Sequence, residues 1–322
     1  MIQKLEQEIY DGKQIEKDTG MLLWEAPIQE LCQAANRIRR HYCGERFDLC
    51  TIINGKSGRC TEDCKYCAQS ACYHAEVESY PLLATDILTK AAKENEKKGV
   101  LRFSVVTSGR ALTDQEIEEM CLSYEVIRKE SGIRLCASHG LLALGQFKKL
   151  KKAGVVRYHN NLETSRRYFP QVCSTHTYDE KIKAIQDARE AGLSVCSGGI
   201  IGMGETLEDR VDLALTLREL SVGSIPLNVL NPIPGTPFGG LEPLKDEEVC
   251  RTVAIFRFIN PRAAIRLAGG RGLLGDKGRQ AFGSGANAAI SGDMLTTSGI
   301  TVQTDMELLK ELGYIPAACD FD

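Results

Sequence analysis

Three cysteines lie close together in one short run of the chain, and their types and spacing are suited to metal chemistry. They are Cys60, Cys64 and Cys67, in the spacing C-x3-C-x2-C. Three thiolates this close can hold three irons of a four-iron cubane and leave the fourth iron without a protein ligand. The run therefore predicts a [4Fe–4S] cluster whose open iron binds a small molecule that can chelate it.

A zinc knuckle or a chance cluster of cysteines is the alternative interpretation. Structural zinc sites need four ligands and usually show paired C-x2-C units, and the sequence has no second C-x2-C pair. The spacing instead resembles the signature of the radical SAM family, in which the amino and carboxylate groups of S-adenosylmethionine (SAM) bind the open iron. Tyr66 matches the aromatic residue that this family places beside the adenine of SAM.

The rest of the chain must position this loop, and its pattern predicts a scaffold of alternating strands and helices. The chain has 322 residues, 43% of them hydrophobic, which is ample for one large domain. Short apolar, β-branched runs alternate with helical patterns, as in parallel strands joined by crossover helices. The eight expected strands lie near residues 48–54, 100–106, 132–137, 155–160, 193–197, 224–230, 263–268 and 286–290.

Helices are expected between these strands and at the start of the chain. The expected crossover helices are Thr85–Lys98, Asp114–Lys129, Ala143–Lys152, Asp179–Ala191, Leu207–Leu220, Asp246–Ile259, Arg271–Phe282 and Asp305–Leu312. Two more helices are expected around Leu5–Ile15 and Pro27–Tyr42. We therefore predict a single α/β domain, a (β/α)8 TIM-type barrel over 46–315 with an N-terminal helical extension at 1–45 and a tail at 316–322. The cysteine loop follows the first strand and so lies at the active-site end of such a barrel.

Composition narrows the class of partners and the compartment. The formal net charge is −3 and the pI is about 6.1, so no basic excess suggests nucleic acid. The polar, acidic start lacks the apolar stretch of a signal peptide, and no run of 18 apolar residues predicts a membrane span. Thirteen cysteines favour a reducing compartment and metal chemistry over disulfides. We expect a cytoplasmic protein that binds neither nucleic acid nor membrane.

Two further segments predict a SAM pocket. After the fifth strand, Gly198, Ile200, Gly202 and Glu205 fit the G-x-I-x-G-x-x-E pattern that supports adenine binding in radical SAM enzymes. Glycines there let the backbone approach a ligand closely, although a tight strand-to-helix turn would use them equally well. After the fourth strand come the polar residues Asn161 and Glu163. They could bind ribose hydroxyls and substrate, or this segment could simply cap a helix.

From about residue 45 to 315 the chain resembles the biotin synthase family. The matching segments are Lys56-Ser57-Gly58-Arg59-Cys60, Cys67-Ala68-Gln69-Ser70, Asn161-Leu162-Glu163-Thr164, Val195-Cys196-Ser197-Gly198-Gly199-Ile200, Pro226-Leu227-Asn228, Pro234-Gly235-Thr236-Pro237 and Ile265-Arg266-Leu267. The resemblance implies conversion of dethiobiotin to biotin, with two SAM used per biotin. A 5′-deoxyadenosyl radical derived from SAM removes hydrogen from two unactivated carbons, and an auxiliary iron–sulfur cluster supplies the sulfur inserted between them.

The resemblance also implies partners for the reaction. Polar groups from strands four and six should hold dethiobiotin, with Asn161 and Asn228 as candidates for its ureido ring. A flavodoxin- or ferredoxin-like protein is the expected electron donor, and a homodimer is expected from the family alone.

The chain departs from the common family pattern at the auxiliary cluster. Family members typically hold a [2Fe–2S] cluster with three cysteines and one arginine, and Cys136, Cys196 and Arg266 match three of these positions. The third cysteine position, after an Arg-Phe pair in strand two, is Ser104 in this chain. Serine is a poor iron ligand beside thiolate, so a standard [2Fe–2S] site is in doubt.

Cys50 is a candidate replacement for the missing thiolate. Cys50, Cys136, Cys196 and Arg266 lie in expected strands one, three, five and seven, and side chains from alternate strands form one layer of a barrel interior. We therefore expect a rebuilt auxiliary cluster, either [2Fe–2S] or larger, with Arg266 as fourth ligand or as a close hydrogen-bond donor. The alternatives are cysteines that only fill core space and a buried pair between Arg266 and a carboxylate.

Two other functions remain compatible with parts of the sequence. Another radical SAM enzyme of the same subgroup would keep Cys60, Cys64 and Cys67 but would not need Cys136, Cys196 and Arg266 together. A non-enzymatic iron–sulfur carrier would not explain a full barrel with a glycine-rich SAM segment. Sulfur insertion by the auxiliary cluster is therefore the leading hypothesis.

Overall fold

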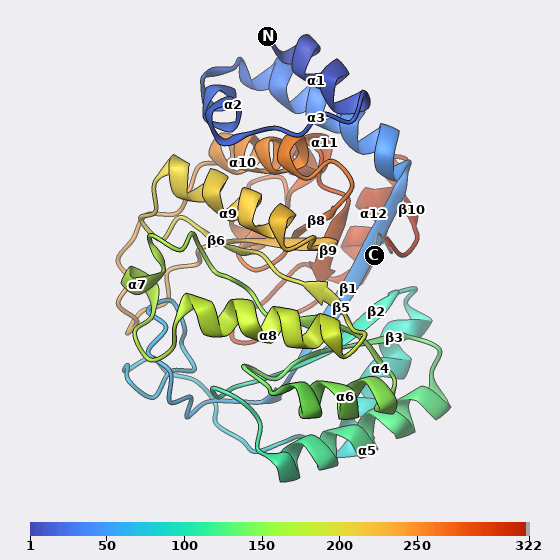
Figure 1. Cartoon of the computed structure of the whole chain (residues 1–322). Coiled ribbons are helices and arrows are strands. Elements are labelled where there is room, and N and C mark those ends of the chain that lie inside the picture. The colour runs from blue at the N-terminus through green and yellow to red at the C-terminus, as the bar shows by residue number, and fades with distance from the viewer. Residues whose placement is uncertain (320–322) are drawn as a thin grey trace.

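The computed structural model describes residues 1–319, and within them a closed barrel of parallel strands forms the centre (Figure 1). Neighbouring strands pair in the order β1-β2-β3-β4-β5-β7-β8-β9, and β9 pairs again with β1 to close the barrel. The strands are β1 (Arg46–Lys56), β2 (Arg102–Thr107), β3 (Arg134–Ser138), β4 (Val155–His159), β5 (Ser194–Cys196), β6 (Gly199–Ile201), β7 (Ser224–Val229), β8 (Ala264–Leu267) and β9 (Ala288–Ser291). The eight predicted strands and the predicted barrel are confirmed.

Helices cover the outside of the barrel and connect successive strands (Figure 1). They are α4 (Thr85–Lys97), α5 (Asp114–Glu130), α6 (Leu144–Ala153), α8 (Tyr178–Glu190), α9 (Leu207–Glu219), α10 (Asp246–Ile259) and α12 (Val302–Glu311). Three of them start at a threonine whose side chain accepts a backbone hydrogen bond in a capping box, namely Thr113, Thr177 and Thr206. Such caps satisfy donors that the first helical turn leaves open, which fixes where each helix begins.

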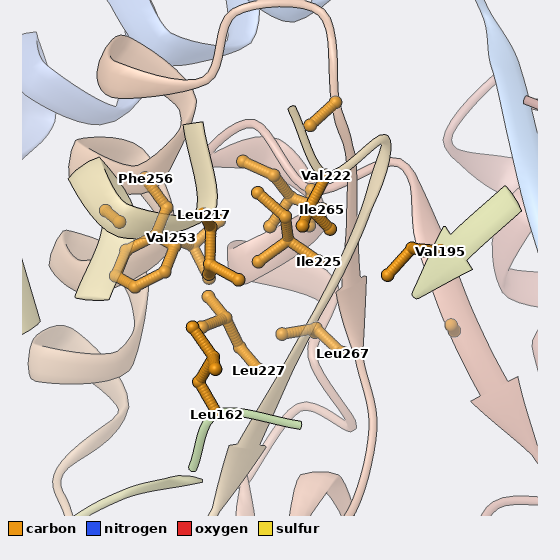
Figure 2. Packing of buried hydrophobic residues seen from close by; sticks show 14 of the residues in the cluster. Leu162, Val195, Leu217, Val222, Ile225, Leu227, Val253, Phe256, Ile265 and Leu267 are labelled. Atoms are coloured by element: carbon orange, nitrogen blue, oxygen red, sulfur yellow. The ribbon is translucent and has the colours of Figure 1, made fainter. Parts of the chain in front are cut away.

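The core lies between the barrel strands and these helices. Figure 2 shows Ile225, Leu227 and Ile265 of the strands packed with Leu217 and Phe256 of the helices. All of these side chains are almost completely buried. Burial of this kind contributes roughly 1.5–3 kcal/mol for each large apolar side chain, so the apolar face of each crossover helix fixes its position.

The N-terminal extension differs from the two helices that we predicted. Its elements are α1 (Ile2–Tyr10), α2 (Lys17–Leu22), the 3-10 turn η1 (Leu23–Glu25) and α3 (Ile28–Cys43). The first helix ends at Tyr10 rather than near Ile15, because Gly12 adopts a φ of 87° and turns the chain. These elements gather beside α10 and α11 in Figure 1.

The single helix predicted over Arg271–Phe282 is wrong. The segment instead forms the 3-10 turn η2 (Arg271–Leu273) and the short helix α11 (Arg279–Gly283). Lys277 and Gly278 between them have φ values of 58° and 91°, which no right-handed helix can contain. The turn leaves Arg271 buried against Asp305 of α12, with nitrogen–oxygen distances of 2.7 and 2.6 Å.

Two short strands were not predicted. The fifth barrel strand is broken into β5 and β6, and β6 pairs with β7 at the active-site end. A Cβ atom on Gly198 would lie 1.9 Å from the carbonyl oxygen of Pro226, and one on Gly199 would lie 2.4 Å from that of Glu163. The second strand, β10 (Ile315–Pro316), pairs with Arg46 and Phe47 of β1, at the start of the segment expected to be a tail.

Within residues 1–319, no helix combines the length and the apolar character needed to cross a membrane.

The break in the fifth strand yields a stability prediction. Gly198→Ala should destabilise the protein by about 1–3 kcal/mol or more, because the added methyl group overlaps backbone that cannot move aside. Gly145→Ala is the matched control, since a Cβ there would meet no heavy atom within 4 Å apart from its chain neighbours and its own helix, α6. Urea unfolding of the cluster-free protein measures both. Equal midpoints for Gly198→Ala and wild type would contradict the close approach.

Candidate functional site

A cavity of about 390 Å³ lies at the active-site end of the barrel and extends between its strands. Two groups of cysteines line it. Cys60 and Cys67 belong to the loop after β1, while Cys50, Cys136 and Cys196 come from β1, β3 and β5. The barrel therefore brings members of both sets of predicted metal ligands to one space, although these cysteines span up to 146 residues of the sequence, from Cys50 to Cys196.

The cysteine loop is held by its own backbone. The amide of Cys60 donates to the carbonyl of Gln69 (3.0 Å), and the carbonyl of Cys60 accepts from the amide of Ala71 (2.8 Å). The amide of Cys67 donates to the carbonyl of Cys64 (3.0 Å). Cys60 and Cys67 line the cavity, whereas Cys64 does not. The loop is thus a closed turn with three half-buried thiols on it.

The spacing of the three loop sulfurs fits a cluster better than a single ion. A tetrahedral zinc site with Zn–S bonds of about 2.3 Å would place thiolates roughly 3.8 Å apart. Among residues 1–319, the sulfurs of Cys60, Cys64 and Cys67 do not all lie within 4.8 Å of one another. A cubane binds each thiolate through a different iron and therefore needs a wider spacing. Binding of a cubane by the three loop cysteines stays a prediction.

Segment 172–176, which begins at the last residue of the short helix α7 (Phe169–Val172), anchors the loop from outside. The amide of Lys65 donates to the carbonyl of Val172 (3.0 Å). The carboxylate of Asp63 accepts from the amides of Ser174 (2.8 Å) and Thr175 (3.1 Å). Burial would raise the pKa of Asp63, but the hydrogen bonds from this segment, chiefly from Ser174, hold that pKa well below its ordinary range. An ionised Asp63 therefore links the loop to this segment.

Four of the predicted SAM-binding residues line the cavity, namely Tyr66, Asn161, Glu163 and Ile200. Tyr66 packs with Ile200 in a small apolar cluster, which suits the face of an adenine ring. Glu163 has a φ of 70°, and its Oε2 atom is buried without a hydrogen-bond partner within residues 1–319. An unsatisfied buried carboxylate oxygen is costly, so its position is explained best by a bound polar ligand.

The other three predicted SAM-binding residues, Gly198, Gly202 and Glu205, do not line the cavity. Glu205 accepts hydrogen bonds from the amides of Gly202 (2.8 Å) and Met203 (2.7 Å) and from Arg210 (2.7 Å). It therefore shapes the loop after β6 from behind. Contact between SAM and these three residues stays a prediction.

The two candidate substrate residues both line the cavity and partly bind backbone. Asn228 donates to the carbonyl of Gly199 (3.0 Å) and accepts from the amide of Gly269 (2.9 Å). Asn161 accepts from the amide of Gly198 (3.1 Å), and its NH2 group has no protein acceptor within the described residues. Each side-chain amide thus keeps hydrogen-bonding capacity for a ligand and is held in place by the strand break.

The deeper cysteines share the cavity with Arg266 of β8 and with Ser104, the position of the missing thiolate. Burial raises the pKa of the Cys50 and Cys136 thiols. Burial acts in the same direction on Cys196, but a hydrogen bond and charge from His159 and the charges of Arg266 and Arg157 lower its pKa to about 6. Cys196 is therefore the deep cysteine best prepared to bind iron as a thiolate.

Asp48 is a buried carboxylate below these cysteines that the sequence analysis missed. It bonds Arg266 (3.0 Å) and Arg102 (2.9 Å), and Arg157 lies 3.8 Å away. Burial would raise the pKa of Asp48, but these three arginines lower it to about 2. The buried Arg266–carboxylate pair considered as an alternative is therefore present. The one signal for this buried group in the sequence is a charged residue, Asp48, within the mostly apolar strand run 48–54.

The loop after β9 also lines the cavity and was not predicted to do so. Its contributing residues are Met294, Leu295, Thr296 and Thr297. The segment has neither helical nor strand periodicity, so the sequence alone carried no signal for its position.

Sequence comparisons agree with this geometry. Residues 56–217 match the radical SAM superfamily, and residues 226–315 match the biotin and thiamin synthesis associated domain. A biotin synthase of Akkermansia muciniphila is 55% identical over 95% of this chain and 95% of its own length. Biotin synthases of Brachyspira hyodysenteriae and Clostridium botulinum (strain Alaska E43) are each 54% identical, over 97% and 98% of this chain and 94% and 99% of their own lengths.

Solved structures show the same fold at low sequence identity. Methylornithine synthase (PylB) superimposes with a TM-score of 0.85 and 18% identity, covering 98% of this chain and 97% of its own. The FeFe-hydrogenase maturase HydG from Carboxydothermus hydrogenoformans has a TM-score of 0.84 and 17% identity, covering 99% of this chain and 80% of its own. At such identities the comparison supports the barrel alone.

The arginine group gives a prediction for the cluster-free protein. Asp48→Asn should lower the free energy of unfolding by about 3–5 kcal/mol, because it removes a buried carboxylate from between three guanidinium groups. Glu130→Gln, which breaks the exposed pair with Lys93, should change it by no more than about 1 kcal/mol. Denaturant unfolding measures both, and equal small effects would show that Asp48 is not needed for charge balance.

Proposed function

The chain belongs to the biotin synthase family of radical SAM enzymes, and from this premise we propose how its residues carry out the conversion of dethiobiotin to biotin. The enzyme contains a [4Fe–4S] cluster and uses SAM to insert sulfur into dethiobiotin. One observation supports the proposed division of roles more than any other. Two of the loop cysteines, Cys60 and Cys67, line the same cavity as the three deep cysteines, so a radical source and a sulfur source can act on one bound substrate.

Cys60, Cys64 and Cys67 are the proposed ligands of the [4Fe–4S] cluster. When bound, this cluster and SAM supply the 5′-deoxyadenosyl radical that removes hydrogen from the substrate. Tyr66 and Ile200 provide an apolar surface for the adenine. Asn161 and the unsatisfied carboxylate oxygen of Glu163 bind polar groups of SAM, while Gly198, Gly202 and Glu205 shape the wall behind them.

Asn161 and Asn228 are the proposed contacts for the ureido ring of dethiobiotin. That ring carries N–H donors and a carbonyl acceptor, and a side-chain amide offers the complementary groups. Both residues are fixed by backbone bonds to Gly198 or Gly199, so they are oriented before the substrate binds. Preorganisation of this kind reduces the entropy lost on binding.

Cys50, Cys136 and Cys196 are the proposed ligands of the auxiliary iron–sulfur cluster, either [2Fe–2S] or a rebuilt larger one. Arg266 is assigned as a hydrogen-bond donor to this cluster. Its guanidinium already bonds Asp48 and the carbonyl of Ala289 (2.8 Å), which leaves N–H groups but favours no direct bond to iron. Ser104 lines the same cavity without a role as ligand.

The remaining expectations are part of the proposal as well. We assign a flavodoxin- or ferredoxin-like electron donor, a homodimer and a cytoplasmic location. The cysteines are all free within residues 1–319, which fits a reducing compartment. The whole chain acts as one domain, with N-terminal helices at 1–45, the barrel at 46–315 and the tail at 316–322.

The first functional prediction concerns the SAM cluster. Cys60→Ala, Cys64→Ala and Cys67→Ala should each abolish reductive cleavage of SAM, because the open-iron cubane needs all three thiolates. Release of 5′-deoxyadenosine after reduction with dithionite is the measurement. Cys121→Ala, in α5 outside the cavity, is the control and should cleave SAM as wild type does. Wild-type cleavage in any loop variant would refute the ligand assignment.

The second functional prediction separates the two clusters. Cys50→Ser should abolish biotin formation yet leave SAM cleavage uncoupled from product, because the loop cysteines are untouched. Iron and sulfide content after anaerobic reconstitution should fall by the share of one cluster. Cys250→Ser, a buried cysteine of α10, is the matched control and should keep both clusters. A Cys50→Ser variant with full iron content and normal biotin yield would exclude Cys50 as a ligand.

A further inference from the structure

Two side chains of types that can bind a metal have no place in the proposed reaction. Cys173 and His176 follow α7 in the spacing C-x2-H and are 3% and 7% exposed. Together with Cys64 they form a set in which the two sulfurs and one imidazole nitrogen all lie within 4.8 Å of one another. Among residues 1–319 it is the one set of three such ligands at this spacing. This set therefore meets the 4.8 Å limit for a single-ion site, which the three loop cysteines do not meet.

The surroundings of His176 are those of a metal-binding imidazole. Its Nδ1 atom lies 2.5 Å from Oε2 of Glu62 and 3.3 Å from the sulfur of Cys173. Its Nε2 atom is buried and has no partner among the described residues. Metal-ligating histidines usually give their second ring nitrogen to a carboxylate, which orients the ring. Here Glu62 supplies that carboxylate at Nδ1, the same nitrogen that lies nearest the sulfur of Cys173. One ring nitrogen can therefore bind a metal while Glu62 keeps the other, once the imidazole turns to divide these two roles between Nδ1 and the unpartnered Nε2.

The charges around the set would compensate a cation. The thiol of Cys173 lies 3.1 Å from Oδ1 of Asp63, and Glu62 bonds the imidazole. Both carboxylates lie within two residues of Cys64 in the sequence, so each approaches the set from the loop side. Two thiolates and an imidazole are ligands that favour zinc, iron(II) and cobalt(II) over magnesium or calcium.

We propose that Cys64, Cys173 and His176 bind one thiophilic divalent metal ion in the cluster-free protein, and that this ion must leave before the [4Fe–4S] cluster can be assembled. Cys64 cannot serve both groups at once, so the two occupancies exclude each other. The exclusion rests on the proposed role of Cys64 in the cubane, whereas the single-ion site does not. By holding this ion, Cys173 and His176 then delay assembly of the cluster until the ion has left.

Cobalt(II) binding to the cluster-free chain tests the site without SAM, substrate or turnover. Under anaerobic conditions, wild type should show the visible and charge-transfer absorption of tetrahedral thiolate-bound Co²⁺. Cys173→Ser and His176→Asn should each weaken this binding at least about 10–100-fold, the loss that even an outer partner of a metal ligand typically causes. Cys60→Ser and Cys250→Ser should bind Co²⁺ as wild type does, and circular dichroism confirms that each variant is folded.

The outcome identifies the ligands. Unchanged Co²⁺ binding by folded Cys173→Ser would overturn the site, as would an equal loss in Cys60→Ser, which would assign the ion to the cysteine loop instead. The exclusion has its own test: cluster-free protein loaded with one Zn²⁺ should take up iron and sulfide more slowly than untreated protein. Cys173→Ser should not show this delay. Equal delay in both proteins would overturn the exclusion while leaving the Co²⁺ result intact.

Discussion

The interior of this barrel depends on one carboxylate, Asp48, placed between three arginines. Asp48 belongs to β1, and Arg102, Arg157 and Arg266 reach it from β2, β4 and β8. A single buried charge would be too costly to keep in a core, but opposite charges with hydrogen bonds can be kept there. The group therefore ties four strands together beneath the cavity. It also leaves the cavity floor rich in guanidinium groups, which favours anionic contents such as thiolates and a sulfide cluster.

At the active-site end, the positions of the candidate residues depend on close contact between two backbone segments rather than on charge. Because Gly198 and Gly199 lack side chains, the segment after β4 can lie against the broken fifth strand, where Glu163 exchanges hydrogen bonds with the backbone of Gly198 and Ile200. This contact holds Glu163 at a φ of 70° with its carboxylate at the cavity. It also fixes Asn161 and Asn228 through their bonds to the same two glycines. One local feature thus orients the candidate residues for both SAM and substrate.

The sequence predicted the elements that have regular periodicity and missed those that depend on tertiary contacts. All eight barrel strands were found because buried parallel strands are continuous apolar runs. The helix over Arg271–Phe282 failed because Lys277 and Gly278 take left-handed conformations, and periodicity does not reveal this. Cys60 and Cys67 could be assigned to one site from spacing alone. Asp48, Cys173 and His176 could not, because their partners are distant in the sequence and meet them only in the folded barrel.

The register of the strands says what the proposed exchange of a thiolate at position 104 for Cys50 would do to the auxiliary site. Ser104 of β2 pairs with Ile52 of β1, whereas Cys50 pairs with Arg102. Cys50 therefore lies one inward-facing position nearer the N-terminal end of the barrel, a step of roughly 6–7 Å along a strand. A cluster that uses Cys50 together with Cys136 and Cys196 must reach further toward Asp48 and its arginines than one ligated at position 104. With the same number of thiolates, such a cluster would lie nearer Asp48 or would contain more iron and sulfide. The added negative charge of sulfide would then lie next to the guanidinium groups best placed to stabilise it.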